Sequence, residues 1–282
     1  MNGNIVQTIM SGIENKAKES VQPSADDYIE DGLLHCGKCR TPKQCVVTLF
    51  GEIRTPYCLC VCETERRERE EEESKRQAFI ARVAKLRRNG FPESRMQDWN
   101  FENDDMSNER VTTAMKRYVE NFEQFCAEGK GLIIHGSVGG GKTYAACEVA
   151  NALIDMGIPV LVTNFARLTN TIQGMYEGKQ EYIDSLSRYA LLVIDDLGAE
   201  RTSEFMQEMV FNIIDSRYRA GLPMIITTNL AMEEMRNPKT IGAGRIYDRI
   251  VERCFPIEVK RESRRRNMAR DNYMDMKNIL GL

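Results

Sequence analysis

The stretch Gly131–Thr143, which reads GLIIHGSVGGGKT, decides the fold of this chain. Its apolar run from Leu132 to Ile134 predicts a buried strand, and the residues from Gly136 onward fit the pattern G-x-x-x-x-G-K-[ST]. Glycines let the backbone curl so that successive N–H groups point into one concavity that binds anions. Residues 144–156 have helical spacing, and the N-terminus of that helix adds partial positive charge below the concavity. The motif therefore predicts a nucleoside triphosphate site.

The predicted phosphate-binding residues are consecutive. They are Gly136, Ser137, Val138, Gly139, Gly140, Gly141, Lys142 and Thr143. We expect Lys142 to reach the β- and γ-phosphates of ATP and the Thr143 hydroxyl to ligate Mg²⁺. A glycine-rich loop can match this pattern by chance, but the strand before it and the helix after it argue against that alternative.

Composition limits the classes of protein to consider. A chain of 282 residues predicts a core domain with an accessory region. The net charge of −3 argues against a globally basic coat for nucleic acid, so any contact with DNA must come from local patches. The sequence has no long apolar run and a polar N-terminus, so we expect a cytoplasmic protein with no membrane partner.

Six of the nine cysteines fall between Cys36 and Cys62, which predicts metal binding because the cytosol keeps thiols reduced. Two closely spaced cysteine groups separated by a short hairpin-like segment suit a tetrahedral Zn²⁺ site. We favour Cys36, Cys39, Cys60 and Cys62 as ligands, with Cys58 as the main competitor and His35 and Cys45 as further alternatives. A redox C-x-x-C motif and unliganded buried thiols are the competing interpretations.

The sequence divides into four predicted segments. They are a flexible N-terminal tail at 1–32, a cysteine-rich zinc-binding module at 33–62, a charged helical linker at 63–94 and an ATPase domain at 95–282. The module has a zinc-ribbon-like layout, in which VVTLFGEI forms two short strands that turn at Gly51.

The ATPase domain alternates apolar strand patterns with helical patterns. Beyond the phosphate-loop strand we predict strands at 159–164, 190–196, 223–229 and 255–260, and a helix at 111–128 precedes them all. Continuous apolar runs are typical of parallel strands that are covered on both faces. The prediction is an α/β fold with a five-stranded parallel sheet between helices.

The segment ALLVIDD at 190–196 ends in two acidic residues. We expect Asp195 to hold Mg²⁺ at the carboxyl end of its strand. Asp196 stands where a general base would orient or deprotonate the attacking water. A buried strand that ends in two solvated acids is the alternative, which the upstream phosphate loop makes weaker.

Four blocks in this order and spacing, GSVGGGKT, LLVIDDLGAE, MIITTNL and GRIYDRI, resemble AAA+ ATPases of the DnaC/IstB-like kind. This group contains bacterial and phage replicative helicase loaders and their transposon relatives, and the resemblance covers about residues 95–270. It implies an AAA+ P-loop core and a sensor 1 role for Asn229, which would position the lytic water. Arg245 and Arg249 would present an arginine finger to a neighbouring subunit, although either one could instead pair with Asp248 or Glu252.

The resemblance also implies partners. The N-terminal region would bind the replicative DNA helicase, and the subunits would self-associate through the arginine-finger interface. Single-stranded DNA would bind the segment between the second and third strands, although two ordinary amphipathic helices explain that segment equally well. Its aromatic and basic residues are Phe165, Tyr176, Tyr182, Arg167, Lys179 and Arg188.

The expected function is that of a helicase loader in DNA replication, in which ATP hydrolysis acts as the switch. We expect slow hydrolysis, because most AAA+ proteins have Glu where this chain has Asp196, and we expect DNA to stimulate it. One alternative is an IstB-like transposition accessory ATPase, against which the cysteine module argues. Another is a DNA-binding protein that uses ATP as a conformational latch.

Overall fold

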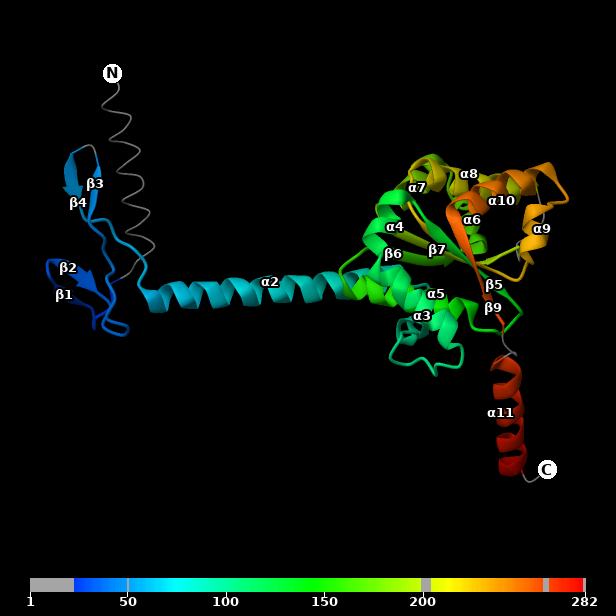
Figure 1. Ribbon diagram of the computed structural model, residues 1–282, viewed down its shortest axis with the longest axis horizontal. Helices are drawn as coiled ribbons and strands as arrows, with labels where there is room; N and C mark the ends of the chain where they lie inside the picture. Colours follow the sequence, from blue (N-terminus) through cyan, green and yellow to red (C-terminus); the bar gives the residue numbers. More distant parts are fainter. Residues whose placement is uncertain (1–22, 50, 199–203, 261–263, 281–282) are drawn as a thin grey trace, which may run out of the picture. The chain divides into compact units, whose positions relative to one another are not determined.

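The computed structural model describes residues 23–49, 51–198, 204–260 and 264–280 (Figure 1). The chain divides into two compact units, Met1–Phe79 and Ile80–Leu282, and the division falls inside the long helix α2 (Val61–Gly90). That helix confirms the charged helix predicted after the cysteines. In the part of the chain that the structure describes, no helix is both long and apolar enough to cross a lipid bilayer.

The first unit contains two short antiparallel hairpins. Strand β1 (Tyr28–Glu30) pairs with β2 (Leu33–His35), and β3 (Val47–Leu49) pairs with β4 (Glu52–Arg54). The second hairpin is the one predicted from VVTLFGEI. Strand β1 lies inside the stretch expected to be a flexible tail, so regular structure begins before Leu33. Residues 1–22 of that tail lie outside the described residues.

The second unit is built on a five-stranded parallel sheet with the order β6-β7-β8-β5-β9, which confirms the α/β prediction. Its strands are β5 (Gly131–Gly136), β6 (Val160–Asn164), β7 (Leu191–Leu197), β8 (Met224–Thr228) and β9 (Cys254–Val259). Each lies where an apolar run predicted a strand. The carboxyl ends of β5, β7 and β8 therefore carry the predicted site residues to one edge of the sheet.

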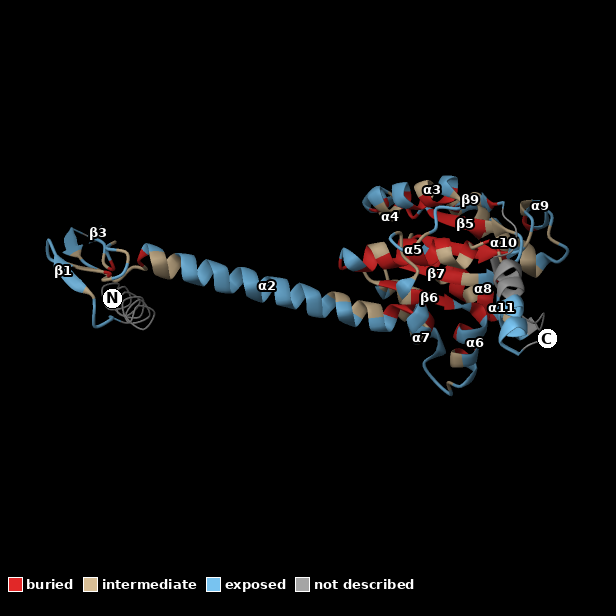
Figure 2. Cartoon of the chain, turned by 90° about the horizontal axis from the view of Figure 1, so that it is seen from below, coloured by how far each residue is buried: buried red, intermediate tan, exposed pale blue. Residues whose placement is uncertain are grey.

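Helices cover both faces of this sheet, and the strands are buried between them (Figure 2). Leu132 and Ile134 belong to the apolar cluster on one face, and Ile133 belongs to the cluster on the other. The first face is covered by α3 (Glu109–Glu120) and α5 (Lys142–Asp155). The second is covered by α6 (Phe165–Gln173), α8 (Glu204–Arg219) and α10 (Ile241–Arg253). Burial on both faces explains why the strands read as continuous apolar runs.

The prediction of a single helix at 111–128 is wrong in one respect. The structure has two helices there, α3 and a separate helix α4 (Phe122–Glu128). Asn121 lies between them with φ −107° and ψ 18°, and its side-chain amide donates to the Arg117 carbonyl at 2.8 Å. Asn competes with the backbone for hydrogen bonds in this way, which ends the first helix. The remaining elements are η1 (Ser94–Asp98), α7 (Lys179–Ser185), η2 (Leu186–Arg188), α9 (Met232–Arg236) and α11 (Arg264–Leu280).

Arg217 of α8 is buried although it is charged, with 2% of its surface exposed. Its guanidinium donates hydrogen bonds to four backbone carbonyls, those of Leu186, Tyr189, Ala190 and Pro223, at 2.7–3.3 Å. Burial lowers the pKa of Arg217 to about 10. These bonds tie α8 to the segment before β7 and to the start of β8.

Candidate nucleotide and metal sites

The phosphate loop connects β5 to α5, as the motif predicted. Gly139 and Gly141 have φ of +80° and +101°, the left-handed region that side chains avoid. At Gly136 a Cβ atom would lie 2.3 Å from the Val259 carbonyl oxygen of the neighbouring strand β9. The glycines are therefore required both by the curl of the loop and by its close approach to β9.

Lys142 begins α5 and is almost fully buried, with 5% of its surface exposed. Its ammonium group donates to the carbonyls of Gly136 at 3.0 Å and Ser137 at 2.9 Å, and to Asn229 Oδ1 at 2.7 Å. Asn229 follows β8 directly. The structure thus brings together two predicted site residues that are far apart in sequence.

Asp195 lies at the carboxyl end of β7 and is close to Thr143. Its Oδ1 accepts a hydrogen bond from the Thr227 hydroxyl at 2.5 Å. Burial raises the pKa of Asp195, and the hydrogen bonds from Thr227 and Thr143 oppose that rise. A carboxylate beside a hydroxyl supplies oxygen ligands of the kind that Mg²⁺ prefers, so the predicted pair fits this ion.

Asp196 has a positive φ of +58°, and the pairing of β7 with β8 shifts register between Ile194 and Leu197. Its amide donates to the Thr227 hydroxyl at 2.9 Å, so one buried threonine contacts both acidic residues. Among non-glycine residues, Asp and Asn adopt this conformation most readily. The backbone therefore gives a physical reason for Asp at a position where Glu was the more familiar expectation.

A cleft of about 210 Å³ lies over the phosphate loop, and Lys142, Thr143, Asp196 and Asn229 are among its lining residues. Trp99 also lines it, and the Trp99 ring stacks on Tyr144 with centroids 5.9 Å apart and planes at 29°. Trp99 additionally packs against the apolar core.

The two candidate finger arginines differ in their contacts. Arg249 donates from Nε to Asp215 of α8 at 2.8 Å, and not to Asp248 or Glu252, the partners considered from the sequence. Arg245 is exposed and lies over the Phe211 ring at 4.5 Å, and no ion pair involves it among the described residues. Arg249, which also lies over the Phe211 ring at 4.7 Å, thus joins α10 to α8 through its ion pair.

The candidate DNA-binding segment folds as α6, α7 and η2. Phe165 was expected to be available for stacking on bases, but it is 1% exposed and belongs to the core. Tyr182 is partly buried against the same cluster, whereas Tyr176 is fully exposed. Arg167, Lys179 and Arg188 are exposed as well.

In the first unit, the sulfur atoms of Cys36, Cys39, Cys60 and Cys62 all lie within 4.8 Å of one another. The Sγ atoms of Cys36 and Cys60 are 3.7 and 3.5 Å from that of Cys62. Thiolates at about 2.3 Å from a tetrahedral Zn²⁺ would be about 3.8 Å apart, so this set fits the ion. Cys58 lies outside the cluster, and its Sγ contacts the Pro42 carbonyl at 3.7 Å.

Sequence reasoning missed the residues that support this cluster. The Asp27 carboxylate accepts from the amides of Ser24 at 2.7 Å and Gly37 at 3.1 Å, and from Lys43 Nζ at 2.5 Å. Burial alone would raise the pKa of Asp27, but the bonds from Lys43 and these amides outweigh it and lower the pKa. Asp27 falls in the stretch expected to be a tail, where no cysteine spacing pointed to it.

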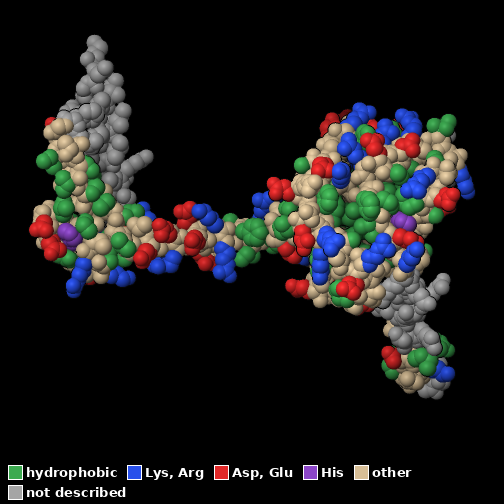
Figure 3. Space-filling view, in the orientation of Figure 1, with side chains coloured by type: hydrophobic (Ala, Val, Ile, Leu, Met, Phe, Trp, Pro, Cys, Tyr) green, Lys and Arg blue, Asp and Glu red, His purple; other side chains and the backbone are tan. Residues whose placement is uncertain are grey.

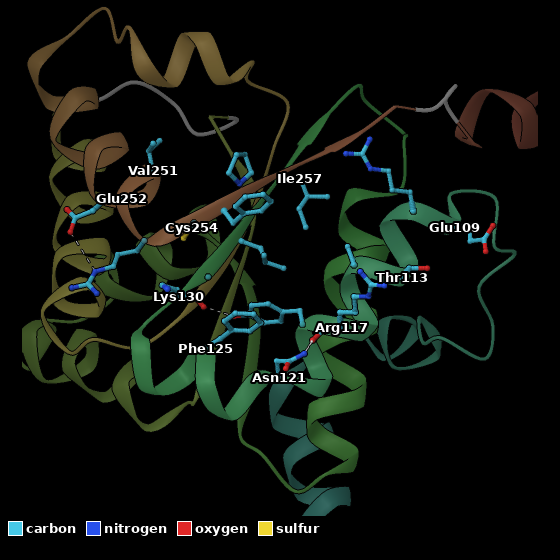
Figure 4. Close-up of a pocket in the computed structure, with 18 residues that line it drawn as sticks. Glu109, Thr113, Arg117, Asn121, Phe125, Lys130, Val251, Glu252, Cys254 and Ile257 are labelled. Atoms are coloured by element: carbon cyan, nitrogen blue, oxygen red, sulfur yellow. Dashed lines mark hydrogen bonds and ion pairs between the residues drawn. The ribbon is translucent and has the colours of Figure 1, made fainter.

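Another hollow has a volume of about 1230 Å³ and lies away from the phosphate loop. Tyr118, Phe125 and Ile257 line it together with Arg117 and Lys130, so it borders α3, α4 and strand β9 (Figure 4). In Figure 3 apolar side chains gather on this part of the second unit, with Lys and Arg side chains around them.

Comparison with known proteins identifies relatives of the second unit. The chain is 29% identical over 171 residues to the replicative helicase loader DnaI of Bacillus subtilis, which covers 56% of this chain and 53% of that protein. It is 28% identical over 166 residues to a putative insertion sequence ATP-binding protein of Sinorhizobium fredii, which covers 56% of this chain and 54% of that protein. The chain thus spans about half the length of these curated relatives.

A solved crystal structure of DnaI has the same fold, with a TM-score of 0.52 and 25% identity over 61% of this chain and 96% of the DnaI chain. The expected AAA+ core of the DnaC/IstB-like kind is therefore confirmed. Residues 58–272 match the family described as IstB-like ATP binding protein, which includes the phosphate loop and all five strands of the sheet. With most of its length matched, this chain belongs to the IstB-like ATP-binding protein family.

Proposed function

We propose that this protein is an ATP-dependent loader of a replicative DNA helicase and that it acts in the cytoplasm. The observation that carries the proposal is the likeness to the loader DnaI, which holds both in sequence and in fold. The nucleotide site supports it, because a phosphate loop, an acidic strand end and Asn229 converge on one cleft.

In the proposed reaction, the loop amides and Lys142 bind the phosphates of ATP. Thr143 and Asp195 hold Mg²⁺, which supplies charge neutralisation on the phosphates. Asp196 accepts a proton from the attacking water, and Asn229 orients that water. Thr227 keeps both acidic residues in place through its hydrogen bonds.

Self-association is proposed to complete the site. Arg245 is our choice for the finger, because it is exposed and has no ion pair among the described residues. An arginine inserted from a neighbouring subunit stabilises charge on the γ-phosphoryl oxygens, a contribution of about 10³–10⁵ in rate where it operates.

The cysteine cluster is proposed to hold a structural Zn²⁺, since four thiolates leave no coordination position open for catalysis. This module, together with α2, is proposed to bind the helicase. Tyr176, Lys179 and Arg188 remain candidates for contact with single-stranded DNA.

The test combines co-elution with the helicase and measurement of phosphate release. Cys60→Ser is expected to abolish co-elution, and Arg245→Ala to remove the single-stranded-DNA-stimulated part of ATP turnover. Arg249→Ala serves as the comparison, because it leaves Asp215 without its α10 partner and is expected to lower thermal stability instead. ATP turnover without helicase binding would contradict the loader proposal.

One alternative rests on a specific observation. The Sinorhizobium relative is as similar to this chain as the loader is, which favours an accessory ATPase of transposition. Co-elution with a transposase in place of the helicase would support that alternative. Absence of DNA-stimulated phosphate release would instead favour ATP as a conformational latch.

A further inference from the structure

One face of helix α5 is polar although the helix is buried. Tyr144, Glu148, Asn151 and Asp155 follow one another at intervals of four, three and four residues, which places them on one stripe. The phosphate chemistry at the start of α5 uses none of them. Tyr144 and Asn151 bond instead to the segment that leads from α2 to α3. Asn151 and Asp155 accept hydrogen bonds from Arg87 of α2.

Asn151 is at the centre of this stripe and is 0% exposed. Its amide nitrogen donates to the carbonyls of Met96 at 2.9 Å and Trp99 at 3.0 Å, as well as to Cys147 within α5. Its Oδ1 accepts from Arg87 Nη1 at 2.6 Å. The side chain can have only this orientation, because rotating the amide would set its oxygen against the carbonyls and its NH₂ group against the guanidinium.

Arg87 lies in the last turn of α2. It also pairs with Asp155 and donates to the Gln97 carbonyl at 3.4 Å. Val83 and Leu86 of the same helix end pack against the apolar core. The end of α2 is thus joined to α5 by apolar packing and by one guanidinium that bonds to three groups.

Trp99 completes the path to the nucleotide. Its carbonyl is held by Asn151, its ring stacks on Tyr144, and it lines the cleft beside Lys142 and Thr143. Two hydrogen bonds, Arg87 to Asn151 and Asn151 to Trp99, therefore connect the end of α2 with the wall of the cleft.

We propose that Arg87 and Asn151 are positioning residues that couple the nucleobase end of the ATP cleft to the C-terminal end of α2. A base that stacks on Trp99 stabilises the same arrangement that these hydrogen bonds stabilise. Because binding linkage is reciprocal, an event that loosens the end of α2 weakens base binding by the same factor. The inference rests on the proposed function to the extent that it requires ATP in this cleft.

Its consequence concerns communication between the two units. Helix α2 begins at Val61, directly beside the cysteine cluster, and ends at Gly90 in the ATPase unit. The coupling would therefore act on the one helix that the two units share, without requiring a change in the phosphate loop itself.

The test uses Trp99, the only tryptophan in the chain, as a reporter in the full-length protein. Its emission is recorded during titration with MgATP and, separately, with inorganic tripolyphosphate and Mg²⁺, which fills the phosphate loop but has no base. Affinities for both are measured by calorimetry. ATP is expected to change the emission, and tripolyphosphate is expected to leave it unchanged.

The two variants compared are Arg87→Gln and Arg88→Gln. Each removes one positive charge from neighbouring positions, but Arg88 is exposed and makes none of these bonds. Arg87→Gln is expected to weaken ATP binding about tenfold, as for loss of a hydrogen bond to a charged group, while tripolyphosphate affinity stays within about twofold. ATP is also expected to slow amide exchange at residues 80–90 in the wild type and in Arg88→Gln, and not in Arg87→Gln.

Equal ATP affinity in the two variants would overturn the inference. So would an equal loss of ATP and tripolyphosphate affinity in Arg87→Gln, which would indicate general damage to the fold. A wild type in which ATP binds without altering Trp99 emission or amide exchange would refute the coupling and leave the proposed ATPase intact. If ATP binding is coupled to the end of α2 as expected but the protein does not bind the helicase, the loader function is contradicted and the coupling is not.

Discussion

Replacing Glu148 with glutamine is expected to remove a pH-dependent loss of stability from the second unit. Glu148 is 1% exposed in α5, and its Oε1 has no hydrogen-bond partner among the described residues. The pKa of Glu148 is raised to about 8. Burial is the largest cause, the nearby Asp104 carboxylate adds to it, and Lys116 opposes the shift. Tyr144 and Asp155 are the other titratable groups on this stripe of α5.

The sign of the effect follows from the difference between the folded and unfolded states. The ordinary pKa of the side chain is 4.5, so between that value and about 8 the folded protein retains a proton that the unfolded chain releases. The free energy of unfolding therefore falls as the pH rises through this window, by about 1.4 kcal/mol per pH unit. Between pH 5 and pH 7 the expected loss is about 2.5 kcal/mol, and the loss levels off above pH 8.

Glutamine resembles the protonated carboxyl group and cannot ionise, so Glu148→Gln lacks this dependence. Thermal unfolding followed by circular dichroism at several pH values between 5 and 8 measures it. The Tm of the variant minus that of the wild type is expected to increase by about 5–10 °C between pH 5 and pH 7. Glu120→Gln, at an exposed position of α3, is the matched control and should show no such increase. Parallel Tm curves for wild type and Glu148→Gln would refute the reasoning.

Three further predictions concern single substitutions. Metal analysis should find about one zinc per chain in Cys58→Ser and less than half of that in Cys60→Ser, because of these two cysteines only Cys60 belongs to the cluster of four. Asp196→Asn should keep wild-type thermal stability, since Asn tolerates positive φ, while phosphate release falls about 100-fold or more. Arg217→Met should lower the free energy of unfolding in urea by about 3–5 kcal/mol, because four backbone carbonyls, two of them in buried residues, lose their donor.

Features that depend on local patterns could be predicted from the sequence. The phosphate loop, the five strands and the set of four cysteines predicted to bind zinc depend on spacing within short segments, and the fold and the sulfur cluster agree with them. Spacing did not decide between Cys58 and Cys60, which the sequence left as competitors, and the clustering of the sulfur atoms favours Cys60. The boundary between helices at Asn121 was missed, because helical periodicity continues through it.

Residues that act through long-range contacts gave no such signal. Thr227 contacts two acidic residues from β7, and Asn151 bonds to a loop about fifty positions earlier, which no periodicity records. Asp27 was assigned to a tail for the same reason. The prediction for Phe165 was wrong because the sequence pattern of an aromatic residue beside basic ones is the same whether the ring packs in the core or stacks on a base.

The hydrogen bonds from Arg217 to backbone carbonyls have a consequence for local unfolding of the second unit. Its four acceptors come from the segment before β7 and from the start of β8, so the guanidinium is satisfied only when both are in place around α8. Detaching residues 186–190 alone would leave a charged group inside the protein with most of its hydrogen bonds broken. This part of the molecule should therefore lack a low-energy local opening, and its amides should exchange with solvent only through the same cooperative event that unfolds the sheet.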